Sequence, residues 1–277
     1  MGAPMSSTSD YDEQIAATRA YWDSFSRFFQ ERMEVTTLQL ARTLASMLRL
    51  PEATAVLEVG AGAGGGAQQV LPALSEGARF VVSDLSPEMV ALARAVLPER
   101  VEVQQADACQ LPFADQSFDR LMANLNLMLV PAPEAALAEA ARVLRPGGRA
   151  GWSVWGRREQ SPMFTLAPRV AQEVGIELPE APRSNFDLGE RESLREQVRA
   201  SGFREVLAWY QPMVRDVGSG SAYVETLAQT PRWAGILAGV SAEQDQAFRE
   251  TLAARVDERL AAGKPIQLDA LIAVADR

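Results

Sequence analysis

The feature that most constrains the fold is a short apolar run that leads into a glycine-rich segment. Residues 55–59 read Ala-Val-Leu-Glu-Val, which is typical of a buried strand, and five of the seven residues from 60 to 66 are glycine. A helix is predicted next, through about Leu74. Small residues where a parallel strand turns into a helix let a ligand touch the backbone. The segment alone is a weak signal, because a tight turn that binds nothing has the same pattern.

The same alternation of strands and helices continues along the chain. Further strands are predicted at residues 79–83, 101–104, 149–155, 203–213 and 266–275, and residues 121–129 are predicted to form a buried strand and its exit loop. Helices are predicted at residues 11–50, 86–96, 134–144, 193–200 and 221–260, and a turn at 146–148. We therefore expect an α/β fold: a Rossmann-like, seven-stranded, mostly parallel sheet with helices on both faces, an antiparallel C-terminal strand pair and a helical cap.

The pattern also suggests how the chain is divided. Residues 1–50 are predicted to form a helical leader or cap, and residues 51–156 a cofactor-binding core. Residues 157–192 lose periodicity and gain prolines, which favours a lid or linker. Residues 193–277 would complete the core, with a helical insertion at 221–260.

Charge and composition exclude several classes of function. The chain has 36 acidic and 27 basic residues, a net charge of −9 that opposes binding to a nucleic-acid backbone. It contains no histidine, so a histidine general base, a histidine-bound metal and a Ser-His-Asp triad are impossible. The one cysteine, Cys109, excludes an internal disulfide and a thiolate zinc cluster, and is predicted to be a buried thiol. We expect a small-molecule substrate, no nucleic acid and no metal.

The cellular location of the protein is predicted from the length of its apolar segments and from its first ten residues. No run reaches the roughly 18 apolar residues of a membrane helix. Residues 1–10 lack the basic segment and apolar core of a secretory signal. We therefore expect a cytoplasmic protein without a membrane span, and the sequence leaves its oligomeric state open.

Acidic residues follow three successive predicted strands. Glu58 stands two residues before the first glycine, and Asp84 follows Gly60 by 24 residues, the usual place for an acid that binds a ribose. This pair suits a nicotinamide or an adenosyl cofactor, and each acid taken alone also suits a helix cap. Asp107 ends the third strand. Three such acids, without a phosphate-binding basic residue nearby, favour a ligand with a ribose, an exocyclic amine and positive charge, such as S-adenosylmethionine.

Four segments in this order carry a family resemblance: Val56–Gly62, Ser83–Met89, Asp107–Asp119 and Glu139–Gly148. Together they resemble class I S-adenosylmethionine-dependent methyltransferases, and more narrowly the branch of quinone-biosynthesis and small-metabolite methyltransferases. The resemblance covers about residues 50 to 156 well, with a weaker continuation in residues 201–203 and the last strand.

The resemblance implies a set of cofactor-binding residues. The turn Gly60-Ala61-Gly62 would approach the methionine part, with Glu58 near its ammonium group. Asp84 would hold the ribose hydroxyls. The remaining implied positions flank the adenine (Leu85, Met89), meet its edge (Asp107, Ala108) or lie beside the sulfonium (Asn124, Leu125).

The chain departs from the family where the acceptor is expected. Family members often carry a histidine pair after the fourth strand, and this chain has Asn126-Leu127-Met128-Leu129 there. A histidine base is thus excluded, and no catalytic residue is assigned. The aromatic residues of the leader are typical of a core face, although in the family a similar leader folds over the cofactor. The candidate acceptor-binding residues are Tyr21, Trp22, Phe25, Asn126 and Trp155.

The function that these observations favour is transfer of a methyl group from S-adenosylmethionine to a small, fairly hydrophobic metabolite. The acceptor atom is oxygen, nitrogen or carbon, and the reaction is an in-line displacement. One alternative is a nicotinamide-dependent oxidoreductase, favoured only by Gly60, Gly62, Gly65 and Asp84 and lacking an obvious Tyr-Lys pair. The other is a protein that binds the cofactor without turnover.

Overall fold

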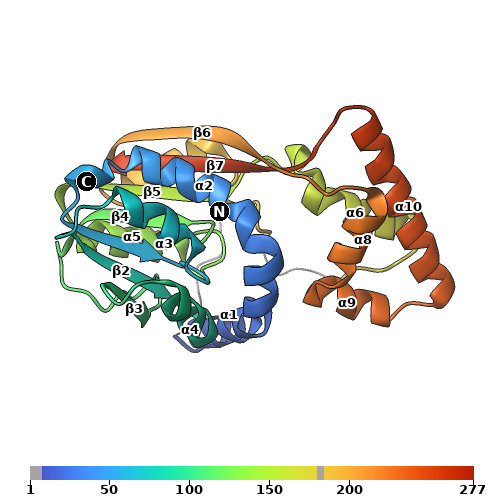
Figure 1. Ribbon diagram of the computed structural model, residues 1–277, viewed down its shortest axis with the longest axis horizontal. Coiled ribbons are helices and arrows are strands. Elements are labelled where there is room, and N and C mark those ends of the chain that lie inside the picture. The colour runs from blue at the N-terminus through green and yellow to red at the C-terminus, as the bar shows by residue number, and fades with distance from the viewer. Residues whose placement is uncertain (1–7, 180–183) are drawn as a thin grey trace. The chain divides into compact units, whose positions relative to one another are not determined.

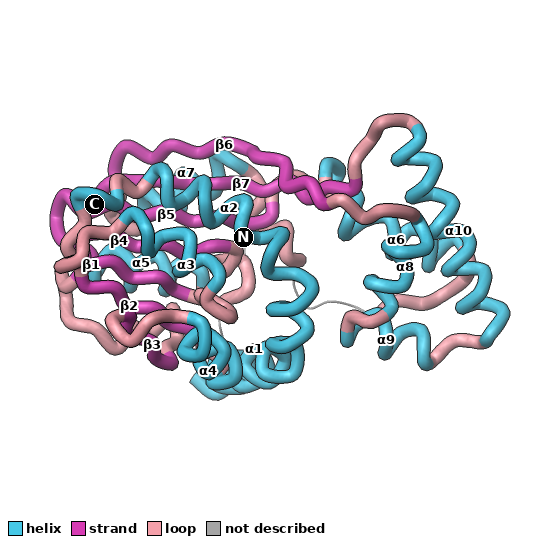
Figure 2. Tube along the Cα trace, viewed as in Figure 1, coloured by secondary structure: helices cyan, strands magenta, loops and turns pink. Residues whose placement is uncertain are grey.

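A computed structural model describes residues 8–179 and 184–277. Residues 1–7 lie outside the described residues. They form most of the segment 1–10 for which the absence of a secretory signal is predicted. Seven strands form one sheet in the order β3-β2-β1-β4-β5-β7-β6 (Figure 2, magenta). The strands are β1 (Ala55–Val59), β2 (Arg79–Asp84), β3 (Val101–Gln105), β4 (Phe118–Asn124), β5 (Leu144–Trp155), β6 (Arg204–Arg215) and β7 (Ile266–Asp276).

The directions of the strands confirm the predicted fold class. Strands β1 to β5 pair in parallel, with β1 between β2 and β4. Gly147 N donates to Arg277 O and Gly156 N to Asp269 O, at 2.9 and 2.7 Å, so β7 runs antiparallel to β5. The sheet is therefore mostly parallel, with an antiparallel C-terminal strand pair and helices around it.

The leader is helical, as predicted, but it is not one regular helix. It consists of α1 (Thr8–Phe28), a π-helical turn η1 (Phe29–Met33) and α2 (Glu34–Met47). Helix α1 packs on α4 (Pro87–Val96), and α2 packs on α3 (Gly65–Val70) and on β4 (Figure 1). The leader thus reaches the elements that follow β1 and β2.

The chain separates into two compact units. The first contains residues 8–154, 190–210 and 271–277, with α5 (Pro133–Val143) and α7 (Arg191–Ala200) besides the helices already named. The second contains the described residues of 155–189 and 211–270. Its helices are α6 (Pro162–Glu173), α8 (Gly220–Ala228), α9 (Pro231–Ala238) and α10 (Ala242–Ala261), and α10 packs on α6 and α8. Among the described residues, no helix has the length and apolar character needed to cross a membrane.

Two local predictions differ from the structure. The turn expected at 146–148 lies inside β5, because Gly147 pairs with the last residue of the chain and keeps the segment in the sheet. Its φ of +79° and a shift in the β4–β5 register mark the irregularity there. The aperiodic segment expected at 157–192 contains α6, where six of twelve residues are buried. This helix was not predicted because prolines usually interrupt helices, whereas here Pro162 is the first helical residue and Pro168 lies inside the helix.

The strand order creates a switch point between β1 and β4. The connection from β1 leads to β2 on one side, whereas β4 pairs on the other side of β1. Ligands of open α/β sheets bind outside the carboxyl ends of strands at such a point. The glycine turn follows β1 there and residues 125–126 follow β4, so the topology places the candidate site between these two loops.

Candidate functional site

The glycine turn after β1 is packed closely against side chains of other elements. Gly60 has φ +65°, a conformation that costs an L-residue about 1–2 kcal/mol. A Cβ atom on Gly60 would lie 2.1 Å from Nδ2 of Asn126, which comes from the loop after β4. The next residue, Ala61, is buried, and its N–H donates to Ser83 O at 3.0 Å. The turn is therefore held against the end of β2 and covered by the β4 loop.

Glu58 is the most unusual acid of the site. Only 1% of its surface is exposed, and Oε2 has no hydrogen-bond partner among the described residues. A Cβ atom on Gly66 would lie 2.3 Å from its other oxygen, Oε1. Burial raises the pKa of Glu58 well above its ordinary value, and the nearby acids Glu34 and Asp84 raise it further. Burying an ionised carboxylate in this way costs folding free energy unless a cation or a hydrogen-bond donor contacts it.

Asp84 at the end of β2 faces the same turn. Its oxygens accept hydrogen bonds from Gly62 N at 2.8 Å and from Ser86 N at 2.9 Å. Burial raises the pKa of Asp84, and these N–H donors act in the opposite direction. Ser86 is the N-cap of α4, and its hydroxyl donates to the carboxylate of Asp23 in α1. Asp84 thus connects the glycine turn with the start of α4, which holds the buried Met89.

Asp107, beyond β3, has partners from the leader. Oδ2 accepts a hydrogen bond from the hydroxyl of Tyr11 in α1, and Oδ1 accepts one from Cys109 N at 2.9 Å. Burial and the bond to Asp107 raise the pKa of Tyr11 above its ordinary value. Ala108 and the Cys109 thiol are buried, which confirms the prediction for the cysteine. The three predicted acids therefore lie at the ends of three adjacent strands.

The predicted residues Asn124, the last of β4, and Leu125, the next in the chain, are held by hydrogen bonds to the fold. The Asn124 amide donates to Thr37 O at 3.3 Å, and its oxygen accepts from the Ser153 hydroxyl at 2.7 Å. Leu125 has φ +53°, which is unusual for a leucine, and its N–H donates to the same hydroxyl at 2.9 Å. Leu85, after β2, is half-buried, and its carbonyl accepts from Gln105 at 2.9 Å.

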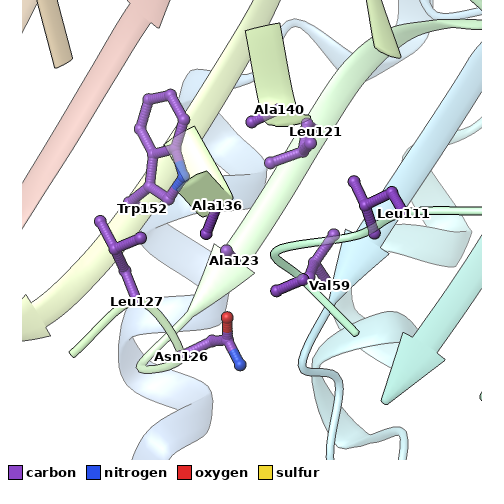
Figure 3. A pocket seen from close by; sticks show the side chains of 10 residues that line it. Val59, Leu111, Leu121, Ala123, Asn126, Leu127, Ala136, Ala140 and Trp152 are labelled. Carbon is purple, nitrogen blue, oxygen red and sulfur yellow. The ribbon is translucent and has the colours of Figure 1, made fainter. Parts of the chain in front are cut away.

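A small apolar cavity lies behind the β4 loop (Figure 3). Asn126, from the loop after β4, is the only amide side chain of its lining, and Trp152 comes from β5. The lining consists of Val59, Ala108, Leu111, Leu121, Ala123, Asn126, Leu127, Ala136, Ala140 and Trp152. The cavity thus joins the predicted residues Ala108 and Asn126.

The predicted acceptor residues of the leader belong to an aromatic cluster on α1. Tyr21, Trp22 and Phe25 have ring centroids 5.5 to 5.7 Å apart. Phe25 is buried, whereas 46% of the surface of Tyr21 is exposed. Trp22 contacts Phe29 of η1 edge to face. Trp155, the fifth candidate, lies in the second unit, where it is buried and its ring contacts Phe164.

Two residues of the leader reach the glycine turn without having been predicted there. Phe29 lies 3.3 Å from the position of a Cβ atom on Gly62. Glu34, the first residue of α2, accepts a hydrogen bond from Gly65 N at 2.9 Å through Oε1. Burial raises the pKa of Glu34, although the bond from Gly65 acts in the opposite direction. Local sequence holds no signal for either contact, since both join elements about 30 residues apart.

Comparison with known proteins agrees with this geometry. Residues 57–151 match the model of a family described as "Methyltransferase domain". The 27-O-demethylrifamycin SV methyltransferase of Amycolatopsis mediterranei is 34% identical over 134 residues, 47% of each chain. The chain spans about half the length of the first curated relatives it matches.

Solved structures share the fold over most of the chain. A structure of the Haloferax volcanii Trm112 methyltransferase activator in complex with a methyltransferase covers 94% of this chain and 96% of its own, at 20% identity and a TM-score of 0.61. The Burkholderia thailandensis 1,6-didemethyltoxoflavin-N1-methyltransferase, solved with S-adenosylhomocysteine, covers 100% and 93%, at 20% identity and a TM-score of 0.56. These matches confirm the resemblance of the sequence to class I S-adenosylmethionine-dependent methyltransferases, and the family model places the methyltransferase domain at residues 57–151.

Proposed function

We propose that this protein transfers the methyl group of S-adenosylmethionine to a small, fairly hydrophobic metabolite at an oxygen, nitrogen or carbon atom. The observation that carries the proposal is Glu58: a buried carboxyl group, close to the glycines after β1, whose Oε2 has no hydrogen-bond partner among the described residues. Such a group fits the end of a ligand that brings a positive charge to the backbone.

The residues at the strand ends fit the three parts of the cofactor. Glu58 and the turn Gly60–Gly62 would bind the methionine part, and Asp84 would accept hydrogen bonds from the ribose. Asp107 and Ala108 would meet the adenine edge. Leu85 and Met89 would flank the ring, and Asn124 and Leu125 would lie beside the sulfonium. Asp84 and Asp107 hold hydrogen bonds within the chain, and new donors would share or replace these.

Catalysis by this chain would depend mainly on alignment. The cofactor supplies a methyl group that is already activated by the sulfonium. Well-oriented reactions gain roughly 7–11 kcal/mol from proximity, whereas a positioned base adds about 10²- to 10⁴-fold. Since the chain has no histidine, any base must be a carboxylate, a tyrosine or water. The chain's contribution is to hold the acceptor in line with the methyl group and to exclude water.

The aromatic residues of the leader support an apolar acceptor. Tyr21, Trp22 and Phe25 form a cluster of rings on α1. The similar Amycolatopsis and Burkholderia proteins are described as methyltransferases of a rifamycin and of a toxoflavin precursor, both small molecules. The proposed acceptor-binding residues of the first unit are Tyr21, Trp22, Phe25 and Asn126, and Trp155 of the second unit stays a separate prediction. The proposed partner is a small molecule rather than nucleic acid.

The test has a binding step and a transfer step. Titration calorimetry should detect binding of S-adenosylmethionine and S-adenosylhomocysteine but not of reduced nicotinamide dinucleotide. Incubation with methyl-labelled S-adenosylmethionine and a pool of small apolar phenols, amines and enols should then label an organic-soluble product. Binding without labelled product from this pool or from a metabolite extract would favour the cofactor-binding protein without turnover. No binding of either adenosyl compound would reject the proposal.

A further inference from the structure

Two carboxyl groups from distant elements lie against the consecutive glycines Gly65 and Gly66 at the start of α3. A Cβ atom on Gly65 would lie 2.6 Å from Cδ of Glu34, and one on Gly66 would lie 2.3 Å from Oε1 of Glu58. Glu58 comes from β1 and Glu34 from the first turn of α2. The leader thus adds an acid to the site that the strand ends do not supply.

The two acids differ in the hydrogen bonds that their carboxyl oxygens accept. Oε1 of Glu34 is fixed by the N–H of Gly65, so its carboxyl group is held in place. Glu58 is 1% exposed, and its Oε2 has no hydrogen-bond partner in the part of the chain that is described. A buried oxygen without a partner indicates that a group outside the chain completes this site.

The charges around the pair are all of one sign. Glu34 from α2 and Asp84 from β2 both raise the pKa of Glu58, and Asp23 from α1 raises that of Asp84. Among the described residues, no basic side chain is among the groups that shift the pKa of Glu58 or Glu34. Like charges in a buried place are relieved by taking up a proton or by binding a cation.

We propose that Glu34 and Glu58 together bind the ammonium group of the cofactor's methionine part, and that this binding expels a proton that the pair holds in the free protein. The inference rests on the proposed function and adds a residue of the leader to its cofactor site. In the step, the protonated carboxyl group gives its proton to the solvent, and the resulting carboxylate pairs with the ammonium group, so that charge and protons balance.

Two ligands isolate the contribution of the ammonium group. S-adenosylhomocysteine carries the amino-acid end, and 5′-methylthioadenosine has the same nucleoside without it. Calorimetry in two buffers of different ionisation enthalpy, at a pH near 6, measures the protons released. We expect a net release of protons when S-adenosylhomocysteine binds and none when 5′-methylthioadenosine binds.

The variant Glu34→Gln keeps the acceptor for Gly65 N–H and removes the charge. It should weaken S-adenosylhomocysteine about tenfold, lower the proton count, and leave 5′-methylthioadenosine unchanged. Glu31→Gln is the matched control, because Glu31 is an exposed acid of the same leader and should change none of these quantities.

The outcomes separate the two proposals. Tight binding of S-adenosylhomocysteine with equal heats in both buffers, or with unchanged affinity in Glu34→Gln, would overturn the role of Glu34 and leave the methyltransferase assignment in place. Equal weakening of both ligands would show that Glu34 only supports the turn, which also overturns the inference. If neither ligand binds the wild-type protein, both proposals fail.

Discussion

Replacing Gly60 by alanine tests whether the turn is shaped by the loop after β4. Two costs are expected. The φ of +65° costs an alanine about 1–2 kcal/mol. The added Cβ atom would lie 2.1, 2.4 and 2.7 Å from Nδ2, Cγ and Cβ of Asn126, and such overpacking typically costs about 1–3 kcal/mol more. Gly60→Ala should therefore lower the free energy of unfolding by about 2–5 kcal/mol.

Gly147→Ala separates these costs. Gly147 has φ +79°, and nothing lies within 4 Å of the Cβ position, so only the backbone cost of about 1–2 kcal/mol applies. Asn126→Gly removes all three clashing atoms. In a double-mutant cycle followed by urea denaturation, Gly60→Ala should cost about 1–3 kcal/mol less in the Asn126→Gly background. If Gly60→Ala costs no more than Gly147→Ala, or if the cycle shows no coupling, the contact between the two loops is not as described.

Three further predictions concern the acids. The pKa of Glu58 is raised above 4.5 in the folded chain, so the free energy of unfolding should fall as pH rises from 4.5 through the raised value. Glu58→Gln should reduce that slope in urea denaturation of the free protein, whereas the raised pKa values of Glu34 and Asp84 keep part of it. An unchanged slope would contradict the burial argument. Asp84→Asn should weaken S-adenosylhomocysteine at least about tenfold in calorimetry, because the ribose loses a charged acceptor; affinity within twofold of wild type would exclude Asp84 from the site. Tyr11→Phe should tighten S-adenosylhomocysteine binding severalfold, since the hydroxyl occupies Asp107 in the free chain. Weaker binding in that variant would instead make Tyr11 part of the cofactor site.

Local pattern was sufficient to predict the sheet. Strand β1 is a short, buried apolar run, and three of the glycines that follow it have a positive φ, a backbone conformation that few other residues adopt. Strand ends of a parallel sheet share one edge, so Glu58, Asp84 and Asp107 could be expected there together. These predictions depend only on residues close in sequence and on a general rule of topology.

The partners of those acids could not be predicted in the same way. Tyr11 lies 96 residues before Asp107, and Asp23 lies 63 before Ser86. Whether a helix of the leader touches the strand ends depends on how it packs on α4, which no local spacing specifies. Helix α6 was missed for a different reason, because proline at its first position and inside it looks like a helix breaker in the sequence.

The π-helical turn explains why Glu34 in particular escapes a periodicity analysis. Apolar residues from Ile15 to Met33 recur at spacings of three or four, and a continuous helix would carry that face onward. The turn Phe29–Met33 adds a residue to the helix, which rotates everything after it by about 100° relative to that extrapolation. Extending the apolar pattern of α1 through the π-helical turn therefore selects the wrong side chains of α2 as those that face the glycine turn. Because π-helical turns occur often at functional sites, the irregularity is itself a reason to expect that the leader carries a residue of the site. Glu34, immediately after the turn, is the one whose carboxyl group contacts Gly65 N.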